Sequence, residues 1–150
     1  PVTIGPRTFP LQLPLHSAFH TPIMEDTARI AQQDLAALPF AAPTIPLVDG
    51  RGHIFRPHWA SSDALKAYTL GVQVIEPYLF QTSLFSALNH CAPDVIVALG
   101  PGNALGGPLA RSLVQCGWRG MQNASDFEEI QQHNPVLLSF GVTKQRSLLV

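Results

Sequence analysis

His20 is the residue of this sequence whose type and setting best fit acid–base chemistry. Imidazole changes its charge near neutral pH, so histidine is a frequent general base in enzymes. Residues 9–15 alternate between large apolar and other side chains, which predicts a strand ending before His20. Thr21 and Pro22 follow directly and predict the N-cap and first position of a helix. A histidine between two rigid elements can point into a cleft. We therefore take His20 as a catalytic candidate, the alternative being that it only caps its own neighbourhood.

The other histidines and the cysteines form no comparable site. Of the six histidines, four fall in predicted loops or at helix ends, where surface and capping roles are more common: His53, His58, His90 and His133. His16 and His20 are four residues apart, but they lie in a predicted loop, unlike the paired histidines of a zinc-protease helix. Cys91 and Cys116 are too few for a four-ligand zinc site or a disulfide scaffold. We predict no bound metal, and the two thiols suit a reducing, cytoplasmic setting.

The glycine-rich segment of residues 100–107 is a second place where a ligand could bind. It reads Gly-Pro-Gly-Asn-Ala-Leu-Gly-Gly and lies between an apolar segment and a predicted helix, the arrangement that holds phosphates in many α/β proteins. Its third glycine comes one position later than in the dinucleotide-binding pattern, and Pro101 lacks a backbone N–H. A tight turn that lets the helix pack near the strand is therefore the favoured interpretation, with a nucleotide site as the alternative.

The elements that must position these residues alternate between strand and helix, which predicts an α/β domain with a mainly parallel sheet. Residues 95–99 are apolar throughout and predict a strand buried on both faces. Gly71 is expected to end a helix, and Ser125 to cap one through Ser-Asp-Phe-Glu. The predicted strands are residues 45–48, 95–99, 118–122 and 136–140, and the predicted helices are residues 22–38, 61–70, 77–91, 104–116 and a short one after 125.

The composition excludes several classes of protein. The chain has 150 residues, enough for one domain, and a net charge of −1, so no overall field attracts nucleic acid or an anionic membrane. Hydrophobic residues make up 46%, which argues against disorder, yet no stretch approaches the roughly 18 apolar residues of a membrane span. Charged residues make up only 13%, against about 25% in an average domain. We therefore expect part of the surface to be covered by protein outside these residues.

The segment Leu13-Pro-Leu-His-Ser-Ala-Phe-His20-Thr-Pro-Ile-Met24 resembles a known active-site motif. It is similar to the catalytic histidine segment of malonyl-CoA:acyl-carrier-protein transacylases and of acyltransferase domains in polyketide and fatty acid synthases. Three later segments are similar to that family in the same order: Pro43-Thr-Ile-Pro-Leu-Val48, Gln73-Val-Ile-Glu-Pro-Tyr-Leu-Phe80 and Val97-Ala-Leu-Gly-Pro-Gly-Asn-Ala-Leu-Gly-Gly107. The resemblance covers about residues 9–125.

This resemblance implies an α/β-hydrolase-like parallel sheet with flanking helices, incomplete in this chain. Residues 1–15 would include the last strand of an inserted ferredoxin-like subdomain, and residues 16–150 would be the C-terminal part of the acyltransferase domain. The family's nucleophilic serine lies in Gly-His-Ser-x-Gly, and no G-x-S-x-G occurs here. The remainder of the same polypeptide is therefore an expected partner, and the segment alone is expected to be inactive.

The resemblance also implies a reaction. The family moves a malonyl group from malonyl-CoA to the phosphopantetheine thiol of acyl carrier protein by a Ser–His ping-pong mechanism without a permanently bound cofactor. His20 would be the general base, and the backbone carbonyl of Gln73 would orient its ring. Phe19 matches the phenylalanine of malonyl-selective domains, whereas Ser17 departs from their pattern. The alternatives are a serine-less docking module for carrier protein and a nucleotide-binding module using residues 100–107.

Overall fold

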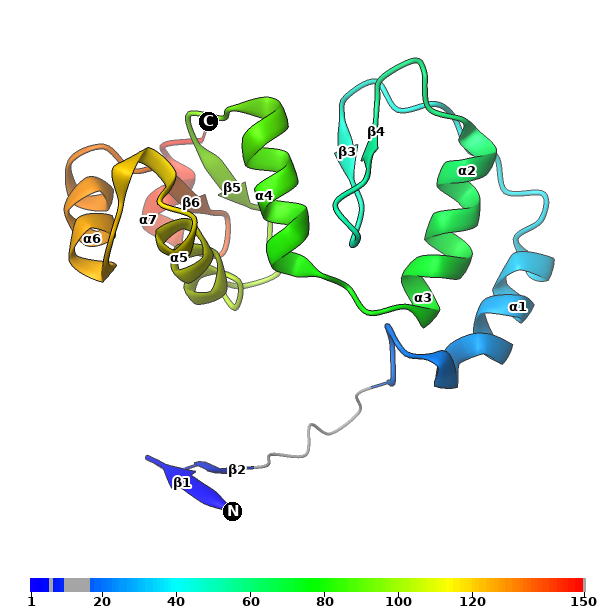
Figure 1. Ribbon diagram of the computed structural model, residues 1–150, viewed down its shortest axis with the longest axis horizontal. Helices are drawn as coiled ribbons and strands as arrows, with labels where there is room; N and C mark the ends of the chain where they lie inside the picture. Colours follow the sequence, from blue (N-terminus) through cyan, green and yellow to red (C-terminus); the bar gives the residue numbers. More distant parts are fainter. Residues whose placement is uncertain (6, 10–16, 150) are drawn as a thin grey trace. The chain divides into compact units, whose positions relative to one another are not determined.

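The computed structural model describes residues 1–5, 7–9 and 17–149 and shows a mixed α/β chain (Figure 1). Helix accounts for about 48% of the chain and strand for 9%, so the sheets are small. The chain forms two compact units. The first comprises Pro1–Pro46 and Phe55–Tyr78, and we call it the histidine unit. The second comprises Leu47–Ile54 and Leu79–Val150, and we call it the glycine-loop unit.

The histidine unit begins with a short hairpin. Strands β1 (Val2–Ile4) and β2 (Arg7–Phe9) pair antiparallel, with Val2 opposite Phe9. Gly5 takes a positive φ of 59° between the strands, a backbone conformation that glycine adopts without a steric penalty. Beyond Phe9, the predicted strand of residues 9–15 lies outside the described residues, as does His16.

The helix predicted after His20 is present but shorter than expected. A 3₁₀ turn, Pro22–Met24, leads into α1 (Glu25–Asp34), and acidic side chains in its first turn complement the helix dipole. The chain then turns before Pro39, so the predicted continuation to residue 38 is wrong. The Thr21 side chain does not cap this helix; its hydroxyl instead donates a hydrogen bond to the Ala18 carbonyl at 2.7 Å.

A second helical segment of this unit supplies the backbone carbonyls that accept hydrogen bonds from His20. Helix α2 (Ser62–Ala67) is capped by Ser61, whose hydroxyl accepts a hydrogen bond from the Ala64 N–H; the sequence is compatible with either Ser61 or Ser62 as the cap. It continues through a π-helical turn, Tyr68–Val72, into α3 (Gln73–Ile75).

Gly71 therefore does not end the helix, contrary to the prediction. A Cβ at this buried position would lie 2.6 Å from the Gln32 side-chain nitrogen, which is the end of a flexible side chain of α1 and can shift away.

The glycine-loop unit contains the parallel strand pair that the sequence predicts. Strands β5 (Ile96–Ala98) and β6 (Leu137–Ser139) pair in parallel, with Ile96 opposite Leu137. The connection between them contains α5 (Gly106–Gln115) and α6 (Ala124–His133), with α4 (Phe80–Cys91) before β5 and α7 (Thr143–Arg146) after β6 (Figure 1). A separate two-stranded sheet joins β3 (Leu47–Val48) to β4 (Ile54–Phe55), and the division between the units runs through β4.

The core of this unit forms where the helices cover the strand pair. Ala98, Leu109 and Leu137 are its buried centre, and Phe80 and Phe127 pack against them. Three further side chains are almost completely buried: Leu113, Met121 and Val136. The core therefore joins α4, α5, α6 and both strands into one packed body.

Three local predictions in this unit are wrong. Strand β5 is not buried on both faces, because Val97 is 36% and Leu99 77% exposed beside a sheet of only two strands in the described residues. Residues 118–122 do not form a strand, since Trp118–Gly120 is a 3₁₀ turn in which Arg119 has a φ of 54°. Asn123, not Ser125, caps α6, and Asp126 completes the capping box three positions later.

No helix in the described ranges combines the length and hydropathy needed to cross a membrane.

Candidate functional site

His20 lies in a loop of the histidine unit with a backbone conformation that is uncommon for residues other than glycine. Its φ is +65°, in the left-handed region that costs a residue other than glycine about 1–2 kcal/mol. Its N–H donates a hydrogen bond of 2.8 Å to the Val74 carbonyl, and the Thr21 hydroxyl closes the loop onto Ala18. Such a conformation persists where the surroundings determine it, and it clusters at functional sites.

The ring of His20 contacts the backbone carbonyl that the family resemblance implies. Its Nδ1 lies 2.6 Å from the carbonyl oxygen of Gln73, the first residue of α3. A carbonyl oxygen only accepts hydrogen bonds, so Nδ1 carries the proton and donates it. In the neutral ring Nε2 is then the unprotonated nitrogen, and no other hydrogen bond to this ring is present in the described part of the chain. This arrangement leaves Nε2 able to accept a proton.

Two aromatic rings lie near the His20 ring. The centroid of Phe19 is 6.5 Å from that of His20, and the centroid of Tyr78 is 5.6 Å away with an angle of 53° between the ring planes. Phe19 and Tyr78 are 53% and 39% exposed, so the site is open. Ser17 is exposed and makes no hydrogen bond to the imidazole. The structure therefore brings His20, Gln73 and Phe19 together and leaves Ser17 outside this group.

Tyr78 is the residue of this site that sequence reasoning missed. It lies in the same segment as Gln73, after Pro77, but nothing in the local pattern indicates which way its ring points. Its contact with a residue of the loop before α1 depends on how α3 and the following residues approach that loop. The only available signal was its proximity in the chain to the predicted Gln73 carbonyl.

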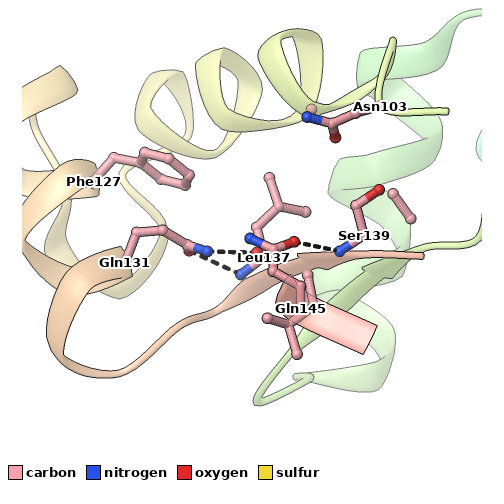
Figure 2. Close-up of a pocket in the computed structure, with 9 residues that line it drawn as sticks. Asn103, Phe127, Gln131, Leu137, Ser139 and Gln145 are labelled. Carbon is pink, nitrogen blue, oxygen red and sulfur yellow. Dashed lines mark hydrogen bonds between the residues drawn. The ribbon is translucent and has the colours of Figure 1, made fainter. Parts of the chain in front are cut away.

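The second candidate, the glycine-rich segment of the other unit, borders a pocket of about 190 Å³ that lies along β6 and includes the last residue of β5 (Figure 2). One part of the pocket is therefore the carboxyl end of the strand pair, where α/β proteins bind ligands. Figure 2 shows Asn103, Phe127, Gln131, Ser139 and Gln145 along its wall. The pocket therefore has polar groups in the expected place.

Most of those polar groups are already used by the protein. The Gln131 amide donates to the Leu137 carbonyl at 2.5 Å, and its oxygen accepts from the N–H groups of Val136 and Leu137. The oxygen of Gln145 accepts a hydrogen bond from the Ser139 N–H at 2.8 Å (Figure 2). These amides satisfy backbone groups of β6, as a neighbouring strand would, which leaves them poorly placed to recognise a ligand.

The glycines of this loop have a packing role. The backbone of Gly102 lies directly against Gly141, and a Cβ at Gly141 would overlap the Gly102 carbonyl. Gly100 and Gly102 adopt positive φ values of 105° and 69°. The segment therefore fits the tight turn that the sequence favours, with the loop held against residue 141.

A buried carboxylate stabilises a turn in the same unit. The Asp49 side chain is 1% exposed and accepts hydrogen bonds from Arg51 Nη2 at 2.6 Å and from the N–H groups of Arg51 and His53. Burial by itself raises the pKa of this carboxyl, but the hydrogen bonds from Arg51 and His53 and the Arg51 charge outweigh it and hold the pKa below 3.8. The Ser83 hydroxyl donates to the Asp49 carbonyl at 2.7 Å, so the turn is tied to α4.

No group of three or more His, Cys, Asp or Glu side chains in the described ranges could hold a metal ion. Comparison with protein-family models, with curated proteins and with solved structures finds no match to this chain.

Proposed function

We propose that this chain supplies the histidine half of a cytoplasmic Ser–His acyltransferase that moves a malonyl group from CoA to acyl carrier protein. The observation that supports the proposal is the 2.6 Å contact between His20 Nδ1 and the Gln73 carbonyl. The four segments similar to the malonyl transferases, in the family's order, supply the reaction class. Their α/β-hydrolase-like fold is part of the proposal, and the parallel β5–β6 pair is compatible with it.

The first half-reaction forms an acyl-enzyme. A serine outside these 150 residues attacks the thioester carbonyl of malonyl-CoA while His20 Nε2 takes its hydroxyl proton. The bond between carbonyl carbon and sulfur breaks, and the imidazolium returns the proton to the CoA thiolate. The Gln73 carbonyl accepts from Nδ1–H throughout, so it keeps the ring oriented and favours the charged form during the step.

The second half-reaction is the reverse with a different thiol. The phosphopantetheine thiol of the carrier protein gives its proton to Nε2 and attacks the serine ester. The ester bond breaks, the malonyl thioester forms, and the serine oxygen recovers the proton from His20. No redox change occurs in either step.

Phe19 is the proposed selectivity residue. Its ring is beside that of His20, where it would crowd an α-methyl group on the substrate and favour malonyl over methylmalonyl. Ser17 stands where the malonyl-selective domains carry histidine. An enzyme that loads methylmalonyl as fast as malonyl would contradict this assignment.

The proposal is tested on the complete polypeptide that carries residues 1–150. Incubation with malonyl-CoA should place a malonyl ester on a serine in a Gly-His-Ser-x-Gly motif, detected by mass spectrometry of intact protein and peptides. The His20→Ala variant is the matched control and should load far more slowly.

A complete polypeptide without such a serine, or loading that is unaffected in His20→Ala, would contradict the function. Binding of carrier protein without any loading would instead favour the docking module.

A further inference from the structure

Tyr78 makes the closer of the two aromatic contacts with the candidate general base, and the proposed reaction assigns it no role. Its ring centroid is 5.6 Å from that of His20, within the range of energetically favourable aromatic pairs, and the planes are tilted by 53°. The same segment supplies the Gln73 carbonyl to Nδ1 and the Val74 carbonyl to the His20 N–H. Residues 73–78 thus contact His20 at its main chain, at one ring nitrogen and at the ring itself.

One hydrogen bond does not hold a half-buried imidazole in a single orientation. The torsion about the bond to the ring has two broad wells, and a flip would carry Nδ1 away from the Gln73 oxygen. Water could then bond to that oxygen, since the site is open. A flipped ring would also lose the constraint that keeps the proton on Nδ1, so Nε2 would no longer be the defined basic nitrogen.

We propose that Tyr78 is a positioning residue whose ring holds the His20 imidazole in the orientation that pairs Nδ1 with the Gln73 carbonyl. The aromatic pair favours this orientation by about fivefold, the middle of the range for such contacts. The phenol oxygen is not needed, because the contact is between rings. The orienting effect is a property of this chain, and its consequence for acyl transfer rests on the proposed function.

The orienting effect is tested by NMR on the 150-residue chain with labelled histidine. At alkaline pH the two-bond ¹H–¹⁵N spectrum of the neutral imidazole distinguishes the protonated nitrogen from the unprotonated one. Wild type should show His20 with the proton on Nδ1. Tyr78→Leu should raise the ratio of the Nε2-protonated to the Nδ1-protonated form about fivefold, and Tyr78→Phe should match wild type.

Phe19→Leu is the matched control, because it removes the more distant ring at 6.5 Å. An equal change in Phe19→Leu, or an unchanged spectrum in a folded Tyr78→Leu, would overturn the proposal. If Tyr78→Leu does not fold, the contact between the two rings is tested in the wild-type protein instead. A nuclear Overhauser effect between the Tyr78 ring protons and the His20 ring protons supports the contact, and its absence overturns it.

The consequence for catalysis is tested separately on the complete polypeptide. Tyr78→Leu should lower kcat for malonyl transfer by up to about twofold with KM unchanged, because a fivefold change in a ratio that favours the oriented ring removes at most about half of the oriented form, and Tyr78→Phe should restore kcat. A raised KM with unchanged kcat would overturn the positioning role. Absence of transfer in the wild-type polypeptide would count against the proposed function alone, because the NMR result does not depend on it.

Discussion

The histidine unit and the glycine-loop unit use unusual backbone conformations for different purposes. In the glycine-loop unit, Gly100 and Gly102 take positive φ values, and the loop packs against Gly141. In the histidine unit, His20 takes a positive φ although it is not glycine, and its ring keeps one nitrogen free of protein partners in the described residues. In the histidine unit the strained residue carries a ring nitrogen that can react. In the glycine-loop unit the positive φ values fall on glycines, which adopt them without strain, and the loop only packs against Gly141.

Positive φ alone does not identify a functional residue. Ala92 also has a positive φ, of 42°, but it ends α4 and its N–H bonds to the Leu88 carbonyl, which is an ordinary helix termination. His20 differs because its ring has an oriented nitrogen and two aromatic neighbours. The comparison teaches that a strained backbone indicates a functional residue only where its side chain also presents a reactive atom without a protein partner.

The largest expected effect is the loss of activity when the His20 ring is removed, and it contrasts with the small effect of removing the Gln73 side chain. In the complete polypeptide, His20→Ala should lower the rate of malonyl transfer about 10³-fold, because the proton acceptor is lost. Gln73→Ala should change it less than about threefold, because the contact uses the backbone carbonyl, which alanine retains. Transfer from labelled malonyl-CoA to carrier protein measures both, and comparable losses would refute the carbonyl assignment.

The packing of the glycine-rich loop against Gly141 is tested by adding one methyl group. Gly141→Ala should lower the free energy of unfolding by about 3 kcal/mol, since its Cβ would overlap the Gly102 backbone. Gly107→Ala is the matched control, because that position has open space and lies in α5. The control should be neutral or stabilising by about 0.5 kcal/mol. Urea unfolding measures both, and equal stability of the two variants would contradict the packing role of the loop.

The Asp49 turn adds a pH-dependent test to the same unit. Asp49→Asn should lower the free energy of unfolding by about 2 kcal/mol at pH 7, because the Arg51 side chain loses a charged acceptor.

The sign of the pH effect follows from the lowered pKa. Because the pKa of the folded Asp49 carboxyl is below 3.8, the unfolded state binds more protons near that pH. This contribution to stability is complete above 3.8 and is lost as pH falls through the folded pKa. The difference between wild type and Asp49→Asn should therefore shrink on acidification, as measured by urea unfolding across this range. A difference in unfolding free energy that stays constant as the pH falls would contradict the lowered pKa of Asp49.

The smallest effect tests whether strain at Ala92 is only structural. Ala92→Gly should raise the free energy of unfolding by about 1 kcal/mol, since glycine adopts the left-handed conformation without a steric penalty. Ala87→Gly, inside the same helix, should lower it by about 1 kcal/mol. Thermal unfolding followed by circular dichroism compares the two, and a destabilised Ala92→Gly would contradict this explanation.

Local patterns predicted several elements correctly because their causes lie within a few residues. Ser61, one of the two serines at the start of the predicted helix of residues 61–70, caps α2 through its own hydroxyl, and α5 lies within the predicted helix of residues 104–116. The errors arose where a residue type or a short apolar stretch is compatible with more than one local conformation. Gly71 lies within a π-helical turn and not at a helix end, and residues 118–122 include a 3₁₀ turn where a strand was predicted.

The sequence by itself determined the chemistry that His20 can perform, its place before a helix, and the parallel strands on either side of α5 and α6. The Gln73 partner was expected from family resemblance rather than from local physics. Only the tertiary structure decided the positive φ of His20, the contact with Tyr78 and the use of Gln131 and Gln145 to complete the edge of β6. The reason is physical: side-chain type and short-range periodicity are local properties, whereas ring orientation and hydrogen-bond satisfaction depend on which distant backbone groups arrive beside them.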